Sequence, residues 1–159
     1  MDAIDLTILD SLQRDARMSN AELARRVEMA PSAVLERVRK LEEHGVIARY
    51  EARLDPRALG AGLAAFVFVR TDEPVGARET EKALAAIRQV QEVHHVAGED
   101  CFLVKVRVAD TQALGTLLRN CIGAIPTVRS TRTTIVLQTV KETGNIPVAN
   151  GSPGSTEAA

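Results

Sequence analysis

Residues 20–47 read NAELARRVEMAPSAVLERVRKLEEHGVI, and this stretch predicts two helices joined by a tight turn. Ser19 and Glu22 have the spacing of a capping box, in which each side chain accepts a hydrogen bond from the backbone of the other residue. The first of the two helices is therefore expected from about Asn20 to Val27. The turn that follows it is only about one helical turn of chain long.

The second helix of the pair is expected to begin at Pro31 and to end at Gly45. Proline is favoured at the first position of a helix because its missing N–H would have no partner there. Glycine commonly ends a helix in the left-handed conformation. Val34, Val38 and Leu41 recur at helical spacing, so they mark the side that packs against the rest of the domain.

The opposite side of this second helix carries short and charged side chains. A short helix, a tight turn and a helix with such a side are typical of the helix-turn-helix motif, whose second helix enters the major groove of DNA. Small residues at its start lie deepest in the groove, a carboxylate can accept from a cytosine amine, and cations can reach guanine or phosphate. The small residues are Ser32 and Ala33, the carboxylate is Glu36, and the cations are Arg37, Arg39 and Lys40. These six are the predicted DNA-binding residues.

A plain helical hairpin with a solvated charged face is the alternative interpretation. Residues 1–60 contain ten Lys and Arg against eleven Asp and Glu, whereas a DNA-binding domain is usually basic overall. The placement of the charges favours the DNA-binding interpretation. Four aspartates belong to the first helix and its end, whereas six basic residues follow from the second helix of the pair onward: Arg37, Arg39, Lys40, Arg49, Arg53 and Arg57.

Composition limits the remaining possibilities. The chain has 159 residues, 45% of them hydrophobic, and a net charge of −1, which allows one large or two small packed domains. It contains no run of eighteen apolar residues and no basic signal sequence. We therefore expect a cytoplasmic protein that does not associate with membranes. No P-loop, GxGxxG, Ser-His-Asp order or zinc-type spacing is present, so we expect no enzyme, no metal and no cofactor.

The segments on either side complete two domains. A first helix from Asp2, its cap, to about Arg14 would make a three-helix domain, and Ile47 to Leu54 alternates as an extended strand before the boundary at Asp55-Pro56. Beyond it the order of predicted elements is βαββαβ, a ferredoxin-like unit with its first and third strands central. The expected ranges are Leu63–Thr71, Gly76–Gln89, Glu92–Ala97, Cys101–Ala109, a helix capped by Asp110, and Val128–Val140.

One face of this sheet is left without helices in such a fold. It would carry either Phe66 and Phe68 or Leu63, Val67 and Val69, depending on the register. A monomer does not leave a large apolar sheet face open to water. We therefore expect a homodimer in which two sheets pack face to face.

The residues from Asp5 to Gly60, DLTILDSLQRDARMSNAELARRVEMAPSAVLERVRKLEEHGVIARYEARLDPRALG, resemble the DNA-binding half of the Lrp/AsnC, or feast/famine, transcriptional regulators. HHVAGEDCFLVKVRV and TIVLQTVKE are similar to that family's ligand-sensing RAM domain. The resemblance covers about residues 2–148. One departure is Ala30, where the family commonly has a serine that caps the second helix.

The resemblance implies an α+β protein with a winged helix-turn-helix domain, homodimers that also form octamers, and a free amino acid as small-molecule effector. That ligand would meet the backbone at Gly98 and the carboxylate of Asp100, with Glu99, Thr131 and Thr133 as further candidates. We accordingly expect a DNA-binding domain at residues 1–47, a strand and linker at 48–61, an effector and dimerisation domain at 62–143, and a tail at 144–159 with a disordered end.

The leading functional prediction is a sequence-specific transcriptional regulator that binds double-stranded DNA and responds to an amino acid. The alternative is an architectural protein that binds DNA with low specificity and has no small-molecule effector. A metabolite-binding or enzymatic sheet domain with an incidental helical appendage is a third hypothesis. The sequence contains no catalytic group that would support it.

Overall fold

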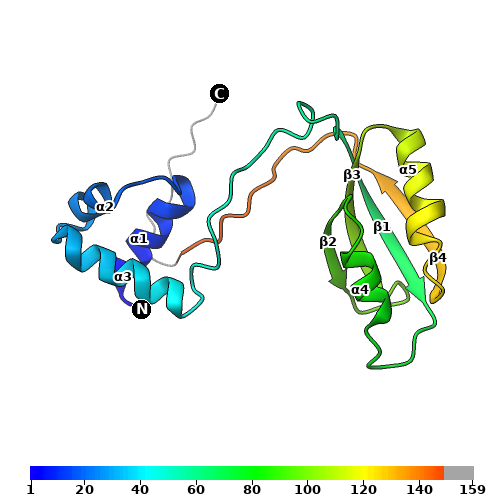
Figure 1. The fold of residues 1–159 in the computed structure, drawn as a ribbon, viewed down its shortest axis with the longest axis horizontal. Coiled ribbons are helices and arrows are strands. Elements are labelled where there is room, and N and C mark those ends of the chain that lie inside the picture. The colour runs from blue at the N-terminus through cyan, green and yellow to red at the C-terminus, as the bar shows by residue number, and fades with distance from the viewer. Residues whose placement is uncertain (149–159) are drawn as a thin grey trace. The chain divides into compact units, whose positions relative to one another are not determined.

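The computed structural model describes residues 1–148, which form two compact units. The first unit consists of Met1–Arg53 together with residues 141–148, and the second is Leu54–Val140 (Figure 1). The chain therefore leaves the first unit once and returns to it. The sequence predicts residues 141–143 as the end of the second domain, whereas in the structure they belong to the first unit.

The first unit contains three helices, α1 (Ala3–Arg14), α2 (Asn20–Val27) and α3 (Pro31–Glu43). The predicted starts of all three are confirmed. Asp2 and Asp5 form a capping box on α1, and Ser19 and Glu22 form one on α2. Each box satisfies backbone N–H groups that have no partner inside the helix.

Apolar side chains from the three helices meet in one small core. Ile8 and Val34 are fully buried, and Leu23 is 1% exposed. The predicted inner side of α3 is confirmed, because Val34, Val38 and Leu41 are its buried residues. Gly45 follows α3 with a φ of +69°, the left-handed conformation that favours glycine.

Helix α3 begins without a side-chain cap. Ala30 occupies the cap position with an extended backbone, and it has no oxygen to accept from the free N–H groups of the first turn. Replacing Ala30→Ser is expected to stabilise the first unit by about 1 kcal/mol. Chemical denaturation followed by circular dichroism measures this, with Ala30→Val as the control that enlarges the side chain without adding an oxygen. A serine variant no more stable than wild type would contradict the expectation.

The strand predicted at Ile47–Leu54 does not form. These residues are extended but no neighbouring strand bonds to them, and a strand needs a partner for its backbone groups. Among the described residues of the first unit there is consequently no β wing. The segment is held instead by Tyr50, whose hydroxyl donates to Glu42 Oε1 at 2.9 Å, near the end of α3.

Tyr50 offers a spectroscopic test of that contact, because it is the only tyrosine in the chain. Partial burial of the ring and the neighbouring Glu42 carboxylate raise its pKa from 10.0 to about 12. A pH jump monitored by phenolate absorbance before unfolding is expected to give a midpoint near this value, and Glu42→Gln is expected to lower it. Because the unfolded phenol loses its proton first, this contribution to stability is complete below pH 10 and is lost as the pH rises towards 12. A midpoint near 10 would show that Tyr50 is not docked on α3.

The second unit is a four-stranded antiparallel sheet with the order β2-β3-β1-β4. The predicted ferredoxin-like arrangement is confirmed, with the first and third strands central. The strands are β1 (Leu63–Thr71), β2 (Val90–His95), β3 (Phe102–Val108) and β4 (Val128–Ile135). The helices are α4 (Glu79–Ala85) and α5 (Thr111–Leu117), and a π-helical turn, Leu118–Ile122, continues α5.

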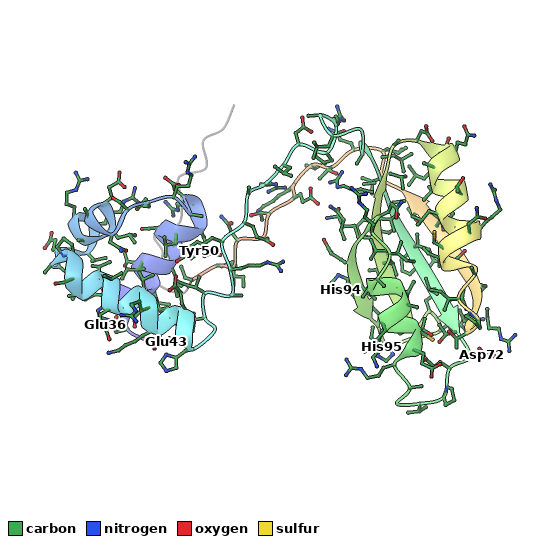
Figure 2. The ribbon with its side chains drawn as sticks, viewed as in Figure 1. Glu36, Glu43, Tyr50, Asp72, His94 and His95 are labelled. Atoms are coloured by element: carbon green, nitrogen blue, oxygen red, sulfur yellow. The ribbon has the colours of Figure 1, made fainter. Side chains whose placement is uncertain are left out.

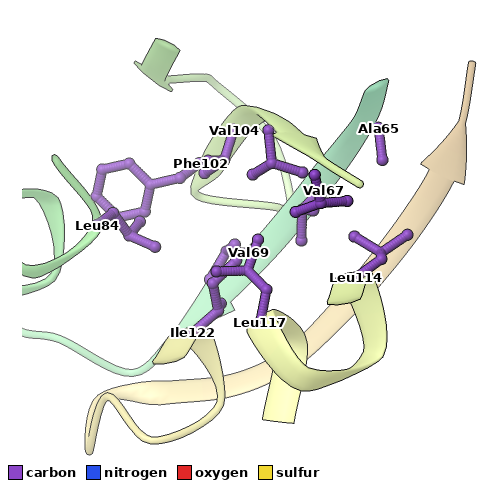
Figure 3. Packing of buried hydrophobic residues seen from close by; sticks show 11 residues of the cluster. Ala65, Val67, Val69, Leu84, Phe102, Val104, Leu114, Leu117 and Ile122 are labelled. Atoms are coloured by element: carbon purple, nitrogen blue, oxygen red, sulfur yellow. The ribbon is translucent and has the colours of Figure 1, made fainter. Parts of the chain in front are cut away.

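Both helices cover the same face of the sheet (Figure 1). Val67 and Val69 of β1 and Val104 of β3 are fully buried there against Leu84 of α4 and Leu117 of α5 (Figure 3). Successive side chains of a strand point to opposite faces. The register therefore assigns Phe66 and Phe68, not Val67 and Val69, to the face without helices.

Helix α4 and strand β4 are several residues shorter than the sequence predicts. Helix α4 begins at Glu79 rather than at Gly76, because the Glu73 carboxylate accepts from the backbone N–H groups of Glu79 and Thr80 at 2.6 and 3.1 Å and so fixes the first turn. Strand β4 ends at Ile135 rather than Val140. Ile135 pairs with Ala65, and the Val136 N–H still donates to the Ala64 carbonyl at 3.0 Å. Because β1 begins at Leu63, it has no residue opposite positions 138–140.

No helix among residues 1–148 is both long enough and apolar enough to cross a membrane. Most of the predicted tail, residues 149–159, lies outside the described residues. Residues 144–148 belong to the first unit, where they contact α1.

A candidate DNA-binding helix and a candidate effector turn

One side of α3 is free of contacts with its own unit. Ser32, Glu36, Arg39 and Lys40 are exposed, and Ala33 is half-buried at the edge of this side. Figure 2 labels Glu36, which lies on this side, and Glu43, the last residue of α3. The side runs along the helix opposite the buried residues, which is the geometry a major-groove helix requires. We call these four exposed residues and Ala33 the outer side of α3.

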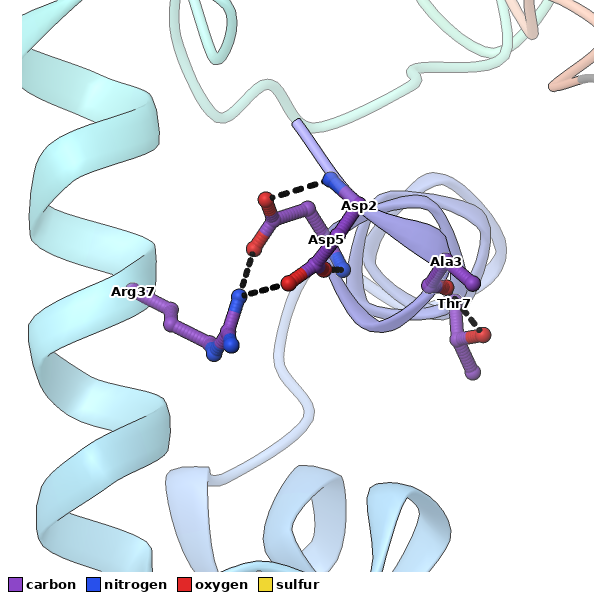
Figure 4. A network of polar contacts seen from close by, with 5 residues as sticks. All are labelled: Asp2, Ala3, Asp5, Thr7 and Arg37. Carbon is purple, nitrogen blue, oxygen red and sulfur yellow. Dashed lines mark hydrogen bonds and ion pairs between the residues drawn. The ribbon is translucent and has the colours of Figure 1, made fainter.

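Arg37 does not belong to this outer side. Its Nη1 lies 2.9 Å from Asp2 Oδ2 and 2.7 Å from Asp5 Oδ1, so the guanidinium bridges α3 to the start of α1 (Figure 4). The two carboxylates raise the pKa of Arg37, and the Asp5 backbone N–H and then Arg37 lower that of Asp2. The role of Arg37 as a DNA contact stays a prediction; in this structure its charge is paired, and it links two helices.

The charge left on the outer side is small. Glu36 and Lys40, one turn apart, form a loose ion pair at 3.7 Å, with both side chains more than half exposed. Such an exposed pair contributes little stability and opens at low cost. Arg39 makes no ion pair among the described residues. The outer side therefore presents one unpaired cation and a carboxylate–ammonium pair that can separate.

Leu35 lies on a flank of α3 by its helical position, and its side chain is 46% exposed in the structure. An apolar side chain next to Glu36 and Arg39 has the chemistry to contact a thymine methyl group. Its signal in the sequence was a leucine outside the apolar repeat of the helix. Arg25 of α2 is exposed as well, on the helix that crosses the DNA backbone in this motif.

The candidate effector turn lies between β2 and β3. Its carboxylates are engaged: Asp100 Oδ2 is 2.9 Å from Arg132 Nη2 on β4, and Glu99 Oε2 is 2.6 Å from Arg70 Nη2 on β1. Gly98 has a φ of +134°, which L side chains rarely adopt, and open space where a Cβ would lie. The turn thus offers a sterically open backbone and two arginine–carboxylate pairs.

The structure separates the two threonines from this turn. Thr131 pairs with Val69 and Thr133 with Val67, so both side chains point to the helix-covered face. Arg132, between them, points to the other face, where its guanidinium lies 3.9 Å from the centre of the Phe68 ring. The predicted effector residues therefore do not form one cluster: Asp100 and Glu99 lie near Arg132 and Arg70, and the threonines lie elsewhere.

The face without helices has an apolar centre and a charged border. Phe66, Phe68 and Leu103 are half-buried there. At its β2 side the Lys105 ammonium lies 3.0 Å from Glu92, whose pKa is lowered by His94 and then by Lys105. This combination of an apolar centre and a polar rim is typical of a surface that packs against another protein.

A small hollow lies on the other face, between α4 and β2. It is lined by Glu81, Lys82, Ala85, Val93, His95 and Phe102. The His95 ring stacks on Phe102, with 5.1 Å between the ring centroids. Its floor is apolar and its rim is charged, but it is wide open to solvent.

The comparisons with known proteins agree with these two units. Residues 1–48 match the family model described as winged helix-turn-helix DNA-binding, and residues 64–146 match the Lrp/AsnC ligand binding domain. Together the two domains define a DNA-binding regulator with a ligand-binding domain. It is a transcriptional regulator and not an enzyme.

The chain belongs to the Lrp/AsnC family. It is 38% identical over 150 residues to the leucine-responsive regulatory protein of Escherichia coli, covering 93% of this chain and 92% of that one. It is 39% identical over 145 residues to the Haemophilus influenzae protein of the same name, covering 90% of this chain and 87% of that one.

Solved structures of relatives extend the comparison. A transcriptional regulator from Neisseria meningitidis in complex with L-methionine superposes with a TM-score of 0.87 at 28% identity, covering 92% of this chain and 96% of that one. The feast or famine regulatory protein of M. tuberculosis complexed with L-methionine gives a TM-score of 0.84 at 38% identity. The match covers 91% of this chain and 97% of that one.

Proposed function

We propose that this protein is a sequence-specific transcriptional regulator that binds DNA as a homodimer through the outer side of α3 and responds to a free amino acid. The exposed outer side of α3 carries this proposal. Its buried opposite side is fixed by the core and by the Arg37 bridge, so the helix presents one constant surface to a groove. Octamers, which the family resemblance implies, are a further expectation.

Charge favours sequence-specific binding over low-specificity packaging. Non-specific binding depends on cations that neutralise phosphates, and residues 1–60 contain one more acidic than basic residue. The charge of Arg37 is already paired with Asp2 and Asp5 of the same unit. Affinity for DNA then requires contacts with base edges, for which Ser32, Glu36 and Arg39 have suitable chemistry.

The Asp100–Arg132 ion pair supports an amino acid as the effector. An α-amino acid carries a carboxylate and an ammonium, so it can insert between the two, with its carboxylate on Arg132 and its ammonium on Asp100. The exchange keeps every charge paired. The crystallised relatives that contain L-methionine make this amino acid the first one to test.

DNA binding is tested by measuring the affinity of the full chain for its own upstream region and for a random duplex of equal length, at low salt. The proposal expects tighter binding to the upstream region. Similar affinities would favour the architectural alternative, and no binding to either would refute both.

The effector is tested by thermal-shift screening of the twenty amino acids, because a ligand that binds only the folded state raises the melting temperature. The response is expected to be lost in Asp100→Asn and retained in Asp72→Asn, which changes a carboxylate paired with Arg129 instead. If no amino acid shifts the wild-type protein, the effector part of the proposal fails and the DNA-binding part stands.

A further inference from the structure

We propose that residues 141–148 form a strap that is an integral fourth element of the DNA-binding unit and connects it to β4. The main contact is made by Gln13, which is half-buried in the last turn of α1. Its Nε2 donates to the Ile146 carbonyl at 3.0 Å, and its Oε1 accepts from the Ile146 N–H at 2.6 Å. One side-chain amide thus satisfies both backbone polar groups of one residue, which fixes the position of the strap along its length.

Further contacts hold the same segment. Arg53 Nη2 lies 3.4 Å from Glu142 Oε2, at the start of the strap. Between these two contacts the Asn145 N–H donates to Thr143 Oγ1 at 3.1 Å, which shapes the segment locally. The strap is therefore held at two points: Arg53 contacts Glu142, and Gln13 contacts Ile146.

This return of the chain gives the DNA-binding unit a second covalent connection to the sheet. Residues 54–62 form the first connection and residues 136–140 form the second. Two short connections leave the units fewer relative orientations than one does, so less orientational entropy is lost when two helix-turn-helix units of a dimer engage two half-sites.

The strap also gives the effector a physical route to α3, an inference that rests on the proposed function. Arg132, the partner of Asp100, lies on β4, and β4 continues into the strap. The strap holds the end of α1, and the start of α1 holds Arg37 of α3. A ligand that displaces Arg132 therefore acts on the strand that leads to the recognition helix.

Amide hydrogen exchange of the full chain, without DNA or ligand, tests whether the strap is docked. Gln13→Leu keeps the size of the side chain but removes both hydrogen bonds, and it is expected to speed exchange of the Ile146 amide at least tenfold. Ile146→Pro removes that amide itself, and it is expected to speed exchange of the Asn145 amide without altering α1. Gln112→Leu, an exposed glutamine of α5, is the matched control and should change nothing there. Equal exchange in wild type and Gln13→Leu would overturn the docking.

DNA binding tests the role of the docked strap. Duplexes with two half-sites are compared at spacings that differ by half a helical turn. Wild type is expected to prefer one spacing strongly, whereas Gln13→Leu should bind that duplex about tenfold more weakly and discriminate less between spacings. An unchanged preference in a variant whose strap exchanges freely would refute the orienting role. If wild type binds no DNA, the proposed function fails, while the exchange experiment still decides whether the strap docks.

Discussion

Replacing Arg39→Ala is expected to weaken DNA binding about tenfold to a hundredfold, which corresponds to the roughly 1–3 kcal/mol of one specific arginine contact. Arg39 is exposed on the outer side of α3, and among the described residues it forms no ion pair that would divert it from DNA. Fluorescence anisotropy with the upstream duplex measures the change. If Arg39 reads a base, the preference for the upstream sequence will fall as well; if it touches phosphate, all sequences will lose affinity alike.

Arg88→Ala provides the matched control for Arg39→Ala. Arg88 is an exposed arginine of the second unit, and its removal changes the net charge by the same amount. Its effect on DNA affinity is expected to be less than twofold, as for a distant surface charge in moderate salt. Equal effects of the two substitutions would mean that the outer side of α3 is not the contact surface.

Phe68→Glu is expected to dissociate the proposed homodimer and to raise its dissociation constant at least a hundredfold. In a symmetric interface each substitution occurs twice, and an unpaired charge buried there costs about 3 kcal/mol or more. Phe68 lies on the face without helices, away from the core around Val67. The monomer should therefore remain folded, because the substitution does not enter that core.

The mass of the protein in solution at micromolar concentration measures this effect. Wild type should give at least twice the mass of one chain and Phe68→Glu the mass of one chain, with unchanged far-ultraviolet circular dichroism. Thr131→Glu is the control, because Thr131 lies on the same sheet but points to the other face. A wild-type mass equal to one chain, or a Phe68→Glu variant that stays dimeric, would contradict face-to-face pairing.

Local signals in the sequence were sufficient for most of the fold. The Ser19–Glu22 capping box, Pro31 and Gly45 fixed the helices of the first unit, because each acts on backbone groups only a few residues away. The apolar runs of β1 and β3 likewise indicated which strands are central. Such short-range preferences can be read without knowing what lies next to the element in space.

The contacts that could not be predicted are those that a distant residue decides. Nothing around Arg37 reveals that Asp2 and Asp5 take its charge, because those residues are more than thirty positions earlier. The register of β4 had to be known before Thr131 and Arg132 could be assigned to opposite faces. The return of residues 141–148 to α1 depends on a single glutamine that has no recognisable spacing.

Peptide-resolved alkylation of Ser32→Cys, measured by mass spectrometry with and without saturating upstream duplex, tests the DNA-binding role of α3 most directly. Ser32 is exposed at the start of the outer side, where the groove would be deepest. DNA is expected to slow the reaction at this position at least tenfold and to leave Gln112→Cys on α5 unaffected. An alkylation rate at Ser32→Cys that is the same in free and DNA-bound protein would contradict the account.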